Sequence, residues 1–139
     1  MKYKQGITVV SLVVYVILLF GFITITLTVS GNFSSNLFDE KGSSTNLSNF
    51  DKLLYYLNES ASTSTDVDIV DNEIAFSNGD VYTYNEGKST VYLNGGILVK
   101  DVTNFSAQQY LTSSIKVECT FTKYTSEISR SINVYVGEW

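Results

Sequence analysis

An uncharged stretch at the start of the chain constrains the fold more than any other feature. No charged residue occurs between Lys4 and Asp39, and 16 of the 23 residues from Ile7 to Val29 are Leu, Ile, Val or Phe. A helix of this length extends roughly 35 Å, enough to cross a hydrocarbon core of about 30 Å. The sequence therefore predicts a membrane-spanning helix over residues 7–30.

The flanking charges predict the orientation of this helix. Lys2 and Lys4 precede the apolar run, and Asp39 and Glu40 follow it. The positive-inside rule then places the N-terminus in the cytoplasm and the rest of the chain outside. The run is too long for an ordinary secretory signal and lacks a small-residue cleavage pattern. We expect a single-pass protein of the cytoplasmic membrane.

The composition excludes several functional classes. The chain has 139 residues, a net charge of −5, no His and one Cys, so the usual zinc sites and the Cys/His and Ser/His nucleophiles are absent. The few Lys and Arg residues are scattered, which argues against a direct nucleic-acid partner. We expect no cofactor and no enzymatic activity. After the span, enough chain remains for about one small domain.

The remaining residues predict an α+β domain. Residues 31–46 are rich in Ser, Asn and Gly and are expected to form a linker that bends near Gly42. A short amphipathic helix is predicted over 47–59, with Thr45 or Ser48 as its N-cap. Its apolar residues recur at helical spacing: Leu47, Phe50, Leu53, Leu54 and Leu57.

From Val67 onward, the hydrophobic period changes from that of a helix to that of a strand. The turn pairs Asn78-Gly79 and Asn94-Gly95 separate alternating segments and predict a meander. Two clearer strands follow, and Arg130 interrupts the apolar face of the second, as expected at a sheet edge. We therefore predict one C-terminal antiparallel β-sheet within an extracytoplasmic domain of residues 47–139.

The residues around Gly6 form a motif at the cytoplasmic edge of the apolar run. Gly6 follows two lysines and directly precedes Ile7-Thr8-Val9-Val10. This stretch resembles the leader of type IV prepilins and of the pseudopilins of type II secretion and competence systems. The resemblance implies that prepilin peptidase removes the leader, residues 1–6, by cutting between Gly6 and Ile7. It also implies N-methylation of Ile7.

One position departs from the family pattern. Most family members carry Glu at the fifth mature position, where it neutralises the N-terminal amine of a neighbouring subunit, whereas this chain has Ser11. Some minor members also lack this Glu and are thought to sit at a filament tip or to start assembly. The segments 73–84, 91–95 and 102–105 look like those of J-type minor pseudopilins. The resemblance therefore implies a minor subunit with a pilin-like fold.

A small polar seam lies near the cytoplasmic end of the predicted span. Thr8, Ser11 and Tyr15 fall within an arc of roughly 100° on an α-helix. Their hydroxyl groups either bond to neighbouring helices or bond back to their own helix, and the sequence leaves both interpretations open. Gly21 is the helix-weakening residue inside the span. These four residues are the expected assembly positions.

Two further features are candidate sites. Asp66, Asp68, Asp71 and Glu73 form the densest carboxylate cluster, and Ca²⁺ prefers several oxygen ligands. Their spacing matches no calcium loop, and solvated strand ends joined by a turn explain the cluster as well. Cys119 lies on the apolar face of a predicted strand, which favours a buried thiol over an intermolecular disulfide.

Together, these features predict a structural protein that initiates or caps a type IV pilus-like filament at the cell surface. Its expected partners are other pilins or pseudopilins, contacted through the N-terminal helix, together with prepilin peptidase and the membrane. The competing hypothesis is a signal-anchored surface binding module, such as an adhesin or a DNA-capture subunit, whose N-terminal helix is only a tether.

Overall fold

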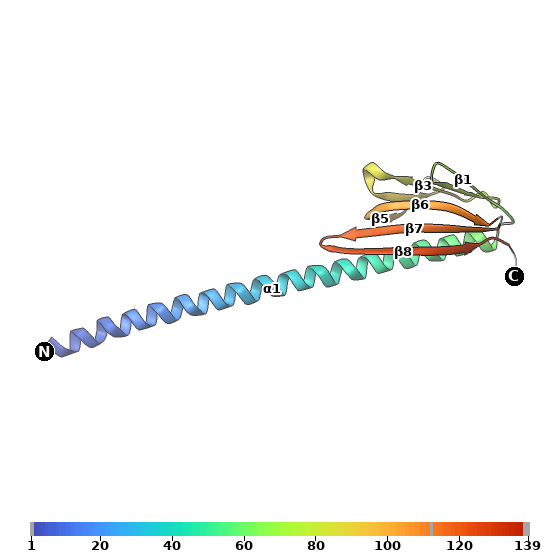
Figure 1. Cartoon of the computed structure of the whole chain (residues 1–139). Helices are drawn as coiled ribbons and strands as arrows, with labels where there is room; N and C mark the ends of the chain where they lie inside the picture. The colour runs from blue at the N-terminus through green and yellow to red at the C-terminus, as the bar shows by residue number, and fades with distance from the viewer. Residues whose placement is uncertain (1, 112, 138–139) are drawn as a thin grey trace. The chain divides into compact units, whose positions relative to one another are not determined.

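The chain forms one long helix followed by antiparallel strands (Figure 1). The computed structural model describes residues 2–111 and 113–137, with side chains from residue 9 onward. The helix α1 spans Lys2–Ser62. The chain divides between Phe38 and Asp39 into two compact units, and the second contains the last part of α1 and all the strands. The expected α+β class with a long, apolar N-terminal helix is confirmed.

The expected linker over residues 31–46 is wrong, because these residues belong to α1. The separate helix over 47–59 is likewise the last part of α1, which continues to Ser62. In a helix interior, Gly costs only about 1 kcal/mol relative to Ala and Ser costs less, so tertiary contacts outweigh the penalty. Thr45, an expected N-cap, instead donates a hydrogen bond from Oγ1 to the Lys41 carbonyl at 2.9 Å.

A five-stranded antiparallel sheet follows the helix, with its strands hydrogen-bonded in chain order. The strands are β1 (Val67–Val70), β2 (Glu73–Phe76), β3 (Val81–Asn85), β4 (Thr90–Leu93) and β5 (Gly96–Lys100). A short 3₁₀ helix, η1 (Glu86–Lys88), joins β3 to β4. The predicted meander is confirmed, and Gly79, Asn94 and Gly95 have the positive φ angles that such turns require.

The last strands form a second antiparallel sheet, in the order β6 (Val102–Leu111), β7 (Ser114–Lys123) and β8 (Ser126–Tyr135). The expectation of one sheet is therefore wrong. The chain leaves the first sheet at Asp101, whose φ of 62° turns the backbone sharply between β5 and β6. Arg130 lies on β8, an edge strand as predicted.

One hydrophobic core joins the end of α1 to both sheets. Leu53 and Leu57 of α1 are fully buried. Tyr82 of β3, Phe105 of β6 and Phe121 of β7 are among the largest side chains in the same cluster. The predicted apolar stripe of α1 is confirmed except at its start, because Leu47 is 46% exposed.

Candidate membrane-spanning and assembly helix

The apolar part of α1 finds no partner within its own chain. Among the described side chains from Val9 to Val29, the large hydrophobic ones are between 39% and 71% exposed. In the described part of the chain, α1 is the helix that is long and apolar enough to cross a membrane. So much exposed apolar surface is stable only in lipid or against other apolar helices.

The structure describes part of the predicted polar seam. Ser11, Tyr15 and Gly21 are all exposed. A Cβ atom added at Gly21 meets nothing within 4 Å, so the single chain gives no packing reason for glycine there. The side chains of Ile7 and Thr8 lie outside those described, and the predicted cleavage after Gly6 stays a prediction.

Three threonines further along the helix bond to their own backbone. The hydroxyl groups of Thr24, Thr26 and Thr28 donate to the carbonyls four residues earlier at 2.8, 2.8 and 2.9 Å. Their alternation with Ile and Leu resembles a strand in the sequence, but a single span must satisfy its backbone as a helix. Because these three hydroxyl groups donate to carbonyls of their own helix, they present no unpaired donor to the surroundings. Small side chains of this kind suit contact with lipid or with a closely packed neighbouring helix.

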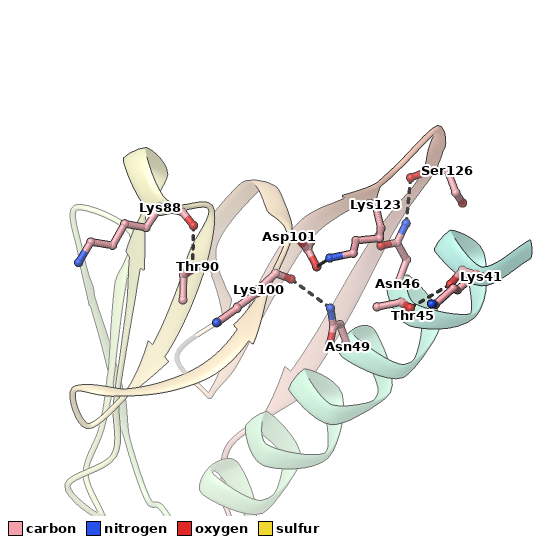
Figure 2. Close-up of polar contacts among 10 residues, drawn as sticks. All are labelled: Lys41, Thr45, Asn46, Asn49, Lys88, Thr90, Lys100, Asp101, Lys123 and Ser126. Carbon is pink, nitrogen blue, oxygen red and sulfur yellow. Dashed lines mark hydrogen bonds and ion pairs between the residues drawn. The ribbon is translucent and has the colours of Figure 1, made fainter. Parts of the chain in front are cut away.

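Within the second unit, the β7–β8 turn is clasped to α1, and we call this contact the clasp (Figure 2). Asn46 Nδ2 donates to the Ser126 carbonyl at 2.9 Å, and Thr125 Oγ1 donates to Asp39 Oδ1. A Cβ atom added at Gly42 would lie 2.6 Å from the Lys123 carbonyl oxygen. Gly42 is therefore a close-contact residue, not the helix break that its flexibility suggests.

Two neighbouring contacts reinforce the clasp (Figure 2). Lys123 Nζ forms an ion pair with Asp101 Oδ2 at 3.0 Å, and the hydrogen bond to Asp101 raises the pKa of Lys123. Asn49 Nδ2 donates to the Lys100 carbonyl at 3.1 Å. Together these contacts fix the last part of α1 against the β5–β6 and β7–β8 turns.

The candidate carboxylates do not form a metal centre in the described structure. Asp66 Oδ1 accepts a hydrogen bond from the backbone N–H of Val67 at 2.8 Å. Asp71 has a φ of 50° in the β1–β2 turn. Across residues 2–111 and 113–137, no group of three or more His, Cys, Asp or Glu side chains is arranged to hold a metal ion. Asp68 and Glu73 lie on exposed positions of paired strands.

A polar cluster at the end of α1 was missed in the sequence. Asp80, between β2 and β3, accepts hydrogen bonds from Ser60 Oγ at 2.7 Å, Asn78 Nδ2 at 2.9 Å and Asn94 Nδ2 at 3.0 Å. Ser60 Oγ also lies 2.8 Å from the hydroxyl of Tyr82. The cluster joins the helix end to two turns that are far apart in the sequence, so no local pattern signals it. We assign it a structural role.

The Asp80 cluster predicts an acid-sensitive contribution to stability. The hydrogen bond from Ser60 is the main cause that lowers the pKa of Asp80 below its usual 3.8, against the opposing effect of desolvation. A lowered folded-state pKa stabilises the fold above the unfolded-state pKa, and this contribution is lost as pH falls through the folded-state pKa. Wild type should therefore lose stability below about pH 4. Between pH 7 and pH 3, the free energy of unfolding should fall less in Asp80→Asn than in the wild type, because the variant has no carboxylate to protonate at this position. Urea unfolding at the two pH values measures the difference.

The matched control for Asp80 is Asp68→Asn, on an exposed position of β1. This variant leaves the three hydrogen bonds to Asp80 intact, so it should keep the part of the loss between pH 7 and pH 3 that comes from Asp80. If Asp80→Asn and the wild type lost the same stability between the two pH values, the hydrogen bonds at Asp80 would not carry the effect.

Cys119 is a buried thiol, as predicted. It is 1% exposed, and its Sγ–H donates weakly to the Arg130 carbonyl at 3.8 Å. Burial raises the pKa of the Cys119 thiol to about 12. The thiol therefore stays protonated at physiological pH and is a poor nucleophile.

The described residues define a class of protein: a membrane-capable helix whose last turns carry an antiparallel β domain. No family model, no curated protein and no solved structure matches the chain. Its function is therefore inferred from its own residues and from the leader resemblance.

Proposed function

We propose that this chain is a minor subunit of a type IV pilus-like filament, inserted with its N-terminus in the cytoplasm and cut between Gly6 and Ile7. The observation that carries the proposal is the exposed apolar surface of α1 from Val9 to Val29. This surface leads directly into the part of the helix that packs on a β domain. In this proposal, the apolar part of α1 spans the membrane before assembly and packs against the helices of other subunits afterwards.

Assembly follows from the physical chemistry of this surface. A helix leaves the bilayer only if other apolar helices replace the lipid around it, so the expected partners are other pilins or pseudopilins. The exposed Gly21 position allows a second helix to approach closely. Because Ser11 cannot neutralise a neighbour's N-terminal amine, the chain fits a position at a filament tip or in an initiation complex. The role is structural rather than enzymatic.

Blocking the cut tests the proposal. In cells with active prepilin peptidase, the wild-type chain should lose residues 1–6 and gain one methyl group, as intact mass spectrometry of the membrane-extracted protein can show. Gly6→Leu should leave the chain uncut, because a bulky residue at the cleavage position obstructs the peptidase. Gly31→Leu is the matched control, since a Cβ atom at Gly31 meets nothing within 4 Å, and it should be cut normally.

A wild-type chain that still begins at Met1 in cells with active peptidase would contradict the proposal and favour the tethered binding module. Immunogold labelling along whole filament shafts, rather than at their ends, would contradict the minor position while leaving filament membership intact.

A further inference from the structure

The outer face of the β1–β5 sheet combines acidic groups with apolar side chains. In β2, Ile74 and Phe76 are buried in the core, so Glu73 and Ala75 point to the opposite, outer face. The register of the strands then gives the other residues of this face. They are Asp68 and Val70 on β1, Glu73 and Ala75 on β2, Val81 and Thr83 on β3, Tyr92 on β4 and Ile97 on β5.

Carboxylates dominate the β1–β2 side of this face. Between Lys52 and Lys88, the sequence has seven acidic residues and no basic one. Four of the seven are exposed on β1, on β2 and beside them: Asp66, Asp68, Asp71 and Glu73. Among residues 2–111 and 113–137, none of these four forms an ion pair. Carboxylates on one face repel one another, and a cationic partner relieves this repulsion.

Apolar side chains occupy the rest of this face and are open to solvent. Val70 is 59% exposed and Ile97 is 56% exposed. Ala75, Val81 and Tyr92, on the strands between them, are partly exposed. A hollow of about 140 Å³ lies between β1 and β2, lined by Asp66, Val67, Asp68, Ala75, Phe76 and Ser77. An exposed apolar patch bordered by polar groups is typical of a surface that binds another molecule.

The carboxylates decide between classes of partner. They repel nucleic acid and anionic lipid, and in a two-fold dimer through this face they would also repel a second copy of the chain. Across residues 2–111 and 113–137, no group of three or more acidic side chains is arranged to hold a metal ion. Addition of a peptide strand at the β1 edge is also disfavoured, because Asn72 Oδ1 bridges from the β1–β2 turn to the Ala107 N–H of β6 at 3.4 Å. A cationic protein segment with apolar side chains matches both parts of the face.

We propose that the outer face of β1–β5 docks a cationic, partly apolar segment of another protein. Lysine or arginine side chains of the partner lie against Asp68 and Glu73, and its apolar side chains lie against Tyr92 and Ile97. This docking does not depend on the cut at Gly6, and it serves a filament subunit and a tethered module equally.

Fluorescence anisotropy of a labelled peptide, titrated with the full chain in an uncharged detergent, tests the proposal. The probe is the capped peptide Lys-Val-Lys-Val-Lys-Val-Lys, which should bind saturably. The double variant Asp68→Asn/Glu73→Gln should weaken this binding about tenfold, because it removes two opposing charges. Ile97→Ser should weaken it about fivefold, because it removes apolar contact area. Both changes are at exposed positions, so the melting temperature should stay that of the wild type.

Matched controls separate this face from the net charge of the chain. Asp51→Asn/Glu127→Gln makes the same change of charge at exposed positions of α1 and β8, and it should bind the probe like the wild type. Leu47→Ser, at an exposed apolar position of α1, should also leave binding unchanged. The equally charged peptide Lys-Ser-Lys-Ser-Lys-Ser-Lys should bind about fivefold more weakly than the probe.

Three results of the titration would overturn the proposal. They are no saturable binding of the probe, equal weakening by the two double variants, and equal affinity for the valine and serine peptides. Light scattering of the chain alone tests the remaining occupant. Self-association that Ile97→Ser abolishes would make a second copy the partner and would also overturn the proposal.

Discussion

Leu57→Ala is expected to lower the free energy of unfolding of the second unit by about 2 to 5 kcal/mol. Leu57 of α1 is fully buried among the core side chains. Truncation removes favourable transfer free energy and leaves a cavity that the surrounding sheets fill only partly. Small domains have only about 5 to 15 kcal/mol of net stability, so the loss is a large share of it.

The measurement for Leu57→Ala is urea unfolding of the full chain in detergent, followed by near-ultraviolet circular dichroism. This signal reports the packing of tyrosines such as Tyr82, whereas the far-ultraviolet signal also contains the apolar part of α1. Leu47→Ala on the same helix is the matched control, because Leu47 is 46% exposed, and it should change stability by at most about 0.5 kcal/mol. Equal effects of the two variants would contradict the packing of α1 on the sheets.

Gly42→Ala is expected to destabilise the second unit by about 1 to 3 kcal/mol, despite the higher helix propensity of alanine. The added Cβ would lie 2.6 Å from the Lys123 carbonyl oxygen and 3.1 Å from Ser126 Cβ. Because the nearest atom belongs to the backbone, the clasp must shift to relieve the clash. The same urea titration measures the loss.

Gly31→Ala is the matched control for Gly42→Ala, because it makes the same chemical change in α1 with nothing within 4 Å of the new atom. It should leave stability unchanged or raise it by at most about 1 kcal/mol. If Gly42→Ala were as stable as Gly31→Ala, the close approach between α1 and the β7–β8 turn would be wrong.

The strands of the first sheet and their turns were predictable because their signals are local. Asn78-Gly79 and Asn94-Gly95 accept the positive φ angles that tight turns need, and the flanking alternation marks which side chains enter the core. The amphipathic stripe ending at Leu57 was predictable for the same reason. Each signal lies within a few residues of the structure that it determines.

The contacts of the clasp and of the Asp80 cluster were not predictable from local signals. Gly42 and Lys123 are far apart in the sequence, as are Ser60 and Asp80, so neither pairing leaves a periodic pattern. Glycine also has two opposite uses, because its flexibility weakens a helix while its lack of a side chain permits close packing. From the sequence alone, Gly42 was expected to weaken the helix. In the structure it instead permits the close approach of the Lys123 carbonyl.

By itself, the sequence determined the long apolar helix, the α+β class and the turns of the first sheet, because these depend on composition, hydrophobic period and turn residues over short stretches. Only the tertiary structure decided that α1 continues without a break to Ser62, that the strands form two sheets, and that Gly42 lies against the β7–β8 turn. These outcomes depend on contacts between distant residues, whose free energies outweigh the local preferences of a single glycine or serine.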